Sequence, residues 1–149
     1  MTGALSTAEI DAVLQSQLIG RLGCHANGVT YIVPISYAYD GTFLYGHSAE
    51  GRKITMLREN PAVCFQTDVM PDMGNWQSII CWGQFEELKE AAHRQQAVQL
   101  LSARQFPLVS SRNMHLNSSW PFQSSDISEV TGVLFRIRLT EKTGRYERS

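Results

Sequence analysis

The chain has 149 residues, of which 43% are hydrophobic, 14 acidic and 13 basic, with a formal net charge of -1 at pH 7. This length is typical of one domain, so we expect residues 1–149 to form a single unit. The near-neutral charge provides no basic field for nucleic acid, and no stretch approaches the roughly 20 apolar residues that span a bilayer. We therefore expect no nucleic-acid or membrane partner, and the lack of a basic-then-apolar leader predicts a cytoplasmic protein.

The first part of the chain predicts one helix followed by three strands. Ser6-Thr7-Ala8-Glu9 has the form of a capping box, and the helix that it begins is expected to stop at Gly20. Strands are then predicted over residues 21–26, 29–39 and 42–47. Asn27-Gly28 and Asp40-Gly41 separate these strands, and both dipeptides favour tight hairpin turns because such turns need positive φ angles. The three strands are therefore expected to be antiparallel neighbours.

The rest of the chain predicts two helices and three further strands. A helix over 51–60 is expected to stop before Pro61. The later elements are strands over 62–69, 76–88 and 130–140 and a helix over 89–103. Residues 104–128 are Ser-rich and irregular, which is typical of a functional or disordered loop. About six antiparallel strands with peripheral helices predict a mainly β protein whose sheet closes, or nearly closes, into a barrel.

The cysteines predict neither a disulfide framework nor a metal site. Cys24, Cys64 and Cys81 are odd in number, lie far apart and form no Cys-x-x-Cys pair. Each lies in a strand-like run, so buried, reduced thiols are expected.

The stretch around Tyr45-Gly46-His47-Ser48 predicts an anion site. A strand ends there, a turn of small residues follows, and a helix opens with Arg52 and Lys53. The first N–H groups of a helix are unpaired and its N-terminal dipole end is positive, so a phosphate is the expected guest. In the alternative interpretation, Ser48 caps the helix, Glu50 lies in its first turn, and the two cations are solvated surface charges.

The even-numbered side of the 29–39 strand offers a small, weakly polar surface at Pro34, Ser36 and Ala38. A strand proline marks an edge or a bulge because it cannot donate to the ladder. A flat ligand fits against such a surface, and a barrel seam where small residues relieve crowding explains it equally well.

Five motifs follow one another along roughly residues 5–103. They are Ile19-Gly20-Arg21-Leu22-Gly23, Tyr31-Ile32-Val33-Pro34-Ile35-Ser36-Tyr37, Leu44-Tyr45-Gly46-His47-Ser48-Ala49-Glu50-Gly51-Arg52-Lys53, Asn60-Pro61-Ala62-Val63-Cys64-Phe65 and Trp76-Gln77-Ser78-Ile79-Ile80-Cys81-Trp82-Gly83. Their order and spacing resemble the pyridoxamine 5′-phosphate oxidase-like, FMN-binding split-barrel proteins. The closest resemblance is to the branch that contains the nitroimidazole-resistance (Nim) proteins.

The resemblance implies a six-stranded antiparallel split barrel that forms a homodimer, with FMN in a cleft at the subunit interface. The implied cofactor-binding residues are Pro34, Ile35 and Ser36 along the isoalloxazine ring, His47, Ser48, Arg52 and Lys53 around the ribityl phosphate, and Trp76 and Ser78 on the next strand. A flavin carries hydride or electrons itself, which fits the lack of a Ser-His-Asp or Cys-His arrangement. The lack of a Gly-x-Gly-x-x-Gly motif argues against a Rossmann dinucleotide site.

The resemblance also implies an FMN-dependent oxidoreductase that reduces nitro-aromatic or similar small-molecule acceptors. A histidine near the flavin is linked to activity in the Nim branch, and His47 and His115 are the candidates here. His115 and Trp120, both in the 104–128 segment, are expected to line the substrate pocket. The alternative is a non-catalytic carrier of flavin, deazaflavin or heme with the same fold, in which His47 or His115 would serve as an axial ligand.

Overall fold

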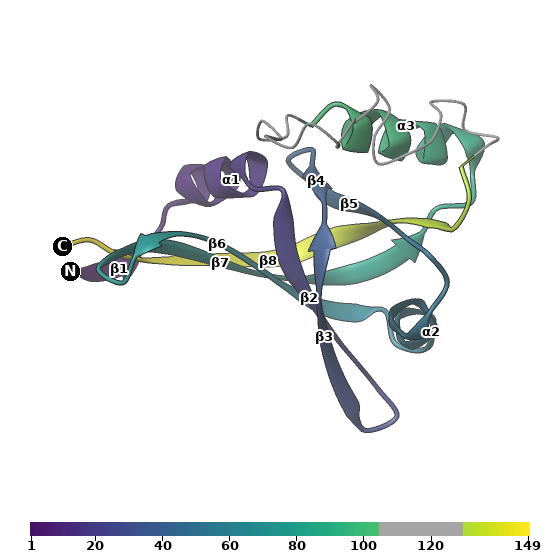
Figure 1. The fold of residues 1–149 in the computed structure, drawn as a ribbon, viewed down its shortest axis with the longest axis horizontal. Coiled ribbons are helices and arrows are strands. Elements are labelled where there is room, and N and C mark those ends of the chain that lie inside the picture. Colours follow the sequence, from purple (N-terminus) through teal and green to yellow (C-terminus); the bar gives the residue numbers. More distant parts are fainter. Residues whose placement is uncertain (105–129) are drawn as a thin grey trace, which may run out of the picture.

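The computed structural model describes residues 1–104 and 130–149, and within them it contains eight strands and three helices (Figure 1). The strands are β1 (Thr2–Ala4), β2 (Ile19–Ala26), β3 (Val29–Ser36), β4 (Ala38–Tyr39), β5 (Phe43–Ser48), β6 (Ala62–Asp72), β7 (Asn75–Glu87) and β8 (Val133–Glu147). The helices are α1 (Thr7–Ser16), α2 (Arg52–Glu59) and α3 (Ala91–Ser102). No helix in the described ranges is long and apolar enough to cross a membrane.

The strands form one antiparallel sheet in the order β3-β2-β6-β7-β8-β5-β4, with β1 added beside β8. β3 and β4 stand at opposite ends of this path, although only Tyr37 separates them in the sequence. The Tyr37 backbone N–H donates to the Leu18 carbonyl at 3.0 Å, and its hydroxyl donates to the Leu14 carbonyl at 2.8 Å. The chain therefore passes from one end of the sheet to the other at an anchored residue. The sheet curls without closing, which confirms the expected mainly β, split-barrel fold class.

Local signals in the sequence located the turns and the start of the first helix correctly. The Glu9 N–H donates to Ser6 Oγ at 3.2 Å and the Ser6 N–H donates to Glu9 Oε1 at 3.0 Å, so the capping box forms. Asn27 and Gly28 have φ angles of 52° and 76°, as the two central residues of a type I′ turn require. Pro34 lies in β3, which pairs only with β2 within the described residues, so the edge-strand interpretation is confirmed.

Several predicted boundaries were wrong. Helix α1 ends at Ser16, and Gly20 lies inside β2, where a Cβ would stand 2.2 Å from the Phe65 ring. The expected strand over 29–39 breaks at Tyr37, so β4 is separate. The strand predicted over 62–69 runs further, to Asp72, as β6, and the strand predicted from residue 76 begins at Asn75 as β7. β8 continues past residue 140 because it pairs with β7 along almost its whole length.

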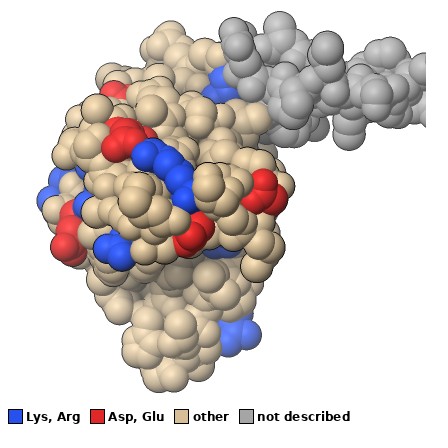
Figure 2. Space-filling model, turned by 90° about the vertical axis from the view of Figure 1, so that its left-hand side faces the viewer, with Lys and Arg blue, Asp and Glu red and all other residues tan. Residues whose placement is uncertain are grey.

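The apolar side chains form two clusters on opposite faces of the sheet. The larger one fills the inside of the curled sheet, where the rings of Tyr37 and Phe65 meet edge-on at 4.9 Å. The smaller one lies between α3 and the strands β5 and β8, and includes Tyr45, Leu101 and Leu134. All three cysteines are free thiols, with Cys24 and Cys81 buried and Cys64 half-buried. The face that carries the two chain ends bears intermixed positive and negative side chains (Figure 2).

Candidate functional site

The start of helix α2 is an uncapped N-terminus. Gly51 occupies the N-cap position, and no side chain forms a capping hydrogen bond there. Ser48 Oγ donates instead to the Ala49 carbonyl at 2.9 Å. The interpretation in which Ser48 caps this helix is therefore wrong. The first N–H groups of α2 are left to attract an anion, as the first turn of a helix does.

Glu50 precedes this helix, and a distant cation holds its carboxylate. Arg58, in the last turn of α2, donates from Nη1 and Nη2 to the two Glu50 oxygens at 2.8 Å each. Arg58 Nε also donates to Glu87 Oε1 at 2.8 Å. These hydrogen bonds hold the pKa values of Glu50 and Glu87 below their usual range. Glu50 thus lies outside the first turn, and Arg58 offsets the negative charge that would otherwise repel an anion.

Arg52 and Lys53 form the first turn of α2, and neither pairs with an acid within residues 1–104 and 130–149. The Arg52 guanidinium lies 5.4 Å from the centre of the Tyr31 ring on β3, at a cation–π distance. Lys53 is half-buried, and burial lowers the pKa of its ammonium group. A bound anion would restore part of the stabilisation that this ammonium loses on leaving water. The two cations, with the uncapped helix start, therefore fit a phosphate group.

The end of β5 is hydrogen-bonded to the residues that lead into β8. His47 Nε2 lies 2.6 Å from the Thr131 carbonyl oxygen. A carbonyl only accepts, so Nε2 carries the hydrogen and donates it. Gly132 has φ of +81°, and a Cβ there would stand 2.8 Å from the Ser48 carbonyl oxygen. The glycine allows this close approach, and the hydrogen bond disfavours His47 as a heme ligand through Nε2.

The residues predicted to lie along the isoalloxazine ring of the flavin are on two faces of β3. Pro34 and Ser36 lie on its exposed face, whereas Ile35 is 7% exposed and belongs to the core. Only the backbone of Ile35 is thus available to a ligand on the exposed face. Because Arg52 contacts Tyr31, the start of α2 lies next to this strand.

A line of polar side chains crosses the exposed face from β3 toward β7. Arg21 is paired in register with Pro34, and its Nη1 lies 3.9 Å from Asp68 Oδ2. Gln66 Nε2 donates to Asp68 Oδ2 at 2.9 Å and to Ser78 Oγ at 3.2 Å. Pro34 on β3 and Ser78 on β7, both predicted to bind the flavin, are therefore linked across the sheet by Arg21, Gln66 and Asp68.

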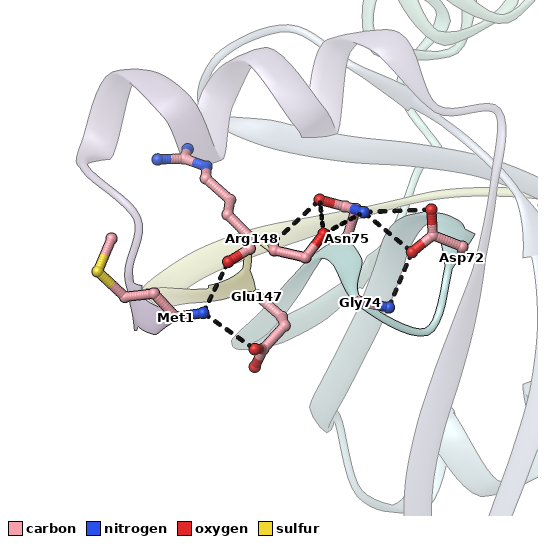
Figure 3. A network of polar contacts seen from close by, with 7 residues as sticks. Met1, Asp72, Gly74, Asn75, Glu147 and Arg148 are labelled. Carbon is pink, nitrogen blue, oxygen red and sulfur yellow. Dashed lines mark hydrogen bonds and ion pairs between the residues drawn. The ribbon is translucent and has the colours of Figure 1, made fainter.

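One chain does not bring β3 and β7 together around a small ligand. Two strands separate them, which at about 4.8 Å per step places Ser78 roughly 14 Å from the Pro34 strand. Trp76 lies two residues closer to the start of β7, where it pairs with Glu147 of β8. Next to it, the turn between β6 and β7 is held by Asp72, which accepts from the Gly74 N–H at 2.8 Å and from Asn75 Nδ2 at 3.0 Å (Figure 3).

Arg104, two residues after the end of helix α3, contacts Ser36, one of the residues predicted to lie along the flavin ring. Its Nη1 donates to Ser36 Oγ and, at 2.9 Å, to the Tyr37 carbonyl. Its Nε donates to the Leu101 carbonyl at 2.9 Å. The side chain is half-buried, and burial lowers the pKa of Arg104 to about 10.

Sequence reasoning missed Arg104 as well as Arg21, Gln66 and Asp68. Polar residues at alternate positions of a strand are typical of any solvent-facing side, and the register that joins them across strands is not visible in the sequence. Arg104 gave no local signal beyond its place at a helix end. His115 and Trp120 lie outside the described residues, and their roles stay predictions.

The comparisons with known proteins agree with this fold. The family model "Pyridoxamine 5′-phosphate oxidase" matches residues 6–146. A crystal structure of an FAD-binding protein from Mesorhizobium loti is 30% identical, with a TM-score of 0.75, and the match covers 100% of this chain and 98% of that one. A candidate 5-nitroimidazole antibiotic resistance protein from Bacteroides thetaiotaomicron is 20% identical, with a TM-score of 0.72 and coverage of 98% and 87%, and shows likeness of fold alone.

A curated relative is an uncharacterised protein from Rhizobium meliloti (strain 1021). It is 36% identical over 84 residues, which are 56% of this chain and 56% of that protein. The match thus spans little more than half of that relative. The match of the family model over residues 6–146 is much longer, and it confirms the family that the five motifs indicated. The chain belongs to the pyridoxamine 5′-phosphate oxidase family.

Proposed function

We propose that this protein binds FMN and acts as an oxidoreductase that reduces nitro-aromatic or similar small acceptors. The start of α2 carries the proposal, because an uncapped helix N-terminus coincides there with Arg52 and the half-buried Lys53. The ribityl phosphate of FMN is a dianion of matching charge. Arginine offers it a planar fork of N–H donors and lysine a point charge.

The residues around this point would hold the rest of the cofactor. His47 and Ser48 flank the phosphate end, and the exposed face of β3 at Pro34 and Ser36 would lie along the ring, with the backbone of Ile35 between them. A bound flavin supplies hydride or electron transfer. The chain's own residues would bind and orient it, and the bond from His47 to the Thr131 carbonyl holds the end of β5, which leads toward α2, against the start of β8.

A homodimer would complete this site. The exposed face of β3, β2, β6 and β7 carries a contiguous apolar stripe, because Ile32, Gly23, Cys64 and Trp82 stand opposite one another in register. Ile32 on β3 is 69% and Trp82 on β7 is 38% exposed, and exposed large apolar side chains in one stripe mark an interaction surface. In a dimer formed through this stripe, Trp76 and Ser78 of a second copy would close the site that one chain leaves open.

The purified protein tests this proposal directly. We expect a flavin absorption spectrum, with FMN as the flavin released on denaturation. The likeness to the FAD-binding protein of Mesorhizobium loti makes FAD the second candidate, and mass spectrometry of the released cofactor separates the two.

An enzyme and a non-catalytic carrier differ in how fast the reduced flavin is re-oxidised by an acceptor. The bound flavin is reduced without oxygen and then mixed with a nitro-aromatic acceptor in a stopped-flow instrument. Re-oxidation much faster than that of free FMN supports an oxidoreductase, and re-oxidation no faster than that of free FMN contradicts it. A heme spectrum, or a colourless protein that binds no added flavin, contradicts the flavoprotein proposal itself.

The affinity for FMN should depend on pH through Lys53. The second pKa of a phosphate monoester is about 6, so affinity should increase as pH rises through that value. Lys53 binds the phosphate only when protonated, and burial lowers its pKa. FMN affinity should therefore begin to fall again as pH rises through this lowered pKa, below the usual range of a lysine. Fluorescence titrations should give this bell shape for FMN, and riboflavin, which has no phosphate, should show neither limb. Parallel curves for the two ligands would remove Lys53 from the site.

A further inference from the structure

Arg104 fixes a cation directly behind the exposed Ser36. The side chain crosses from the end of α3 to the corner between β3 and β4, where it donates to Ser36 Oγ and to the Tyr37 carbonyl. The bond from Nε to the Leu101 carbonyl holds its stem against the last turn of α3. Arg104 and Tyr37 also line a cavity of about 520 Å³ between α1 and α3. The guanidinium is thus held at the corner between β3 and β4, in hydrogen-bonding contact with the exposed Ser36.

The direction of this hydrogen bond determines what Ser36 can do. A guanidinium has five N–H donors and no acceptor, so Ser36 Oγ accepts from Arg104. The hydroxyl hydrogen must then point away from Arg104. Ser36 is exposed and ends the edge strand β3, so its O–H is available to an acceptor on the exposed face where the flavin ring is proposed.

We infer that Arg104 is a positioning residue that holds Ser36 as a donor toward the polar edge of the flavin and thereby raises the reduction potential of the bound cofactor. The inference rests on the function proposed above. Reduction adds negative charge to that edge, and a fixed donor with a cation behind it stabilises the added charge more than it stabilises the oxidised ring.

The half-buried position of Arg104 strengthens this effect. Burial lowers its pKa only to about 10, so the guanidinium stays charged at neutral pH. Its field is screened less than that of a cation in water, because a partly desolvated charge acts through a medium of lower effective dielectric.

The reduction potential of the bound flavin tests the inference. Arg104→Met removes the donors and the charge but retains an apolar stem, and Ser36→Ala removes the hydroxyl. Each variant should bind reduced flavin about ten-fold more weakly relative to oxidised flavin, which lowers the two-electron potential by about 30 mV. The double variant should fall no lower than the single variants, because Arg104 acts through Ser36. Ser36→Thr, which retains a hydroxyl, should keep most of the wild-type potential.

Arg94→Met is the matched control for packing of α3. Arg94 also ties this helix to backbone carbonyls, those of Leu88 and Val130 at 3.4 Å each, but it does not contact Ser36. Its potential should equal that of the wild type. An equal drop in Arg94→Met, additive drops in the double variant, or an unchanged potential in Arg104→Met would each overturn the inference.

A variant that fails to fold and a wild-type protein that binds no flavin have different consequences for the inference. Should Arg104→Met fail to fold, Arg104→Lys replaces it and should retain part of the potential that Ser36→Ala loses; equal potentials in the wild type, Arg104→Lys and Ser36→Ala would overturn the inference. A wild-type protein that binds no flavin refutes the proposed function, whereas normal flavin binding with unchanged potentials refutes only the role of Arg104.

Discussion

Replacing Arg52 and Lys53 together with alanine is expected to weaken FMN binding by about a hundred-fold or more and to leave riboflavin binding nearly unchanged. A hydrogen bond to a charged group contributes about 1.5–3 kcal/mol, and the loss of one phosphate contact therefore costs about ten- to a hundred-fold in affinity. The two cations open the same helix turn and pair with no acid in the described residues, so the phosphate would be their main partner. Flavin fluorescence titrations of both ligands measure the effect.

A double variant with the same change in net charge provides the control. Arg138→Ala with Arg148→Ala removes two cations whose side chains are each 52% exposed and which lie on β8 or just beyond it. FMN affinity should change little in this protein, particularly at physiological salt, where exposed charges are screened. Equal losses of FMN and riboflavin in the α2 variant would show that Arg52 and Lys53 support the fold of the site and that the phosphate lies elsewhere.

The phosphate end of the site was predictable because its parts are close together in the sequence. A strand end, a short turn and a helix start lie within residues 45–54, and the unpaired N–H groups of a helix start need no tertiary contact to attract an anion. The distinction between a cap and an anion site was not predictable. It depended on Arg58 in the last turn of α2, whose side chain hydrogen-bonds the Glu50 carboxylate and keeps it from the first turn of the helix.

The ring end of the site depends on contacts that the sequence does not display. Ser36 and Arg104 are 68 positions apart, and Gln66 meets Ser78 only because β6 and β7 pair in one particular register. A shift of one residue would place Ser78 on the opposite face of the sheet. The length of β8 was hidden for a similar reason. Its last part, residues 141–147, is mostly charged or small, with Tyr146 as its one large apolar-bodied side chain, and pairing with β7 rather than hydrophobicity keeps it extended.

Replacing Ile32 with glutamate is expected to convert the protein to a monomer and to remove the flavin with the same change. Ile32 is 69% exposed, so the single chain should fold without difficulty. In a dimer built on the stripe Ile32-Gly23-Cys64-Trp82, the new carboxylate would be buried against an apolar surface, and its copy on the other chain would be buried as well. Such uncompensated charges cost several kcal/mol, or about a hundred-fold or more in self-association. Light scattering at micromolar concentration measures the mass, and flavin absorbance measures occupancy.

Gln95→Glu is the matched control, because it adds the same charge at an exposed position of α3, which packs against β4, β5 and β8 rather than against the strands that carry the stripe. It should stay dimeric and retain its flavin. The mass and the flavin occupancy of Ile32→Glu test the dimer interface and the shared flavin site separately. A dimer that persists in this variant places the interface elsewhere than on the stripe. A monomer that binds FMN as tightly as the wild type places the whole site in one chain. The roughly 14 Å between Ser78 and the Pro34 strand would then have to be bridged by the cofactor within that chain, without a second copy.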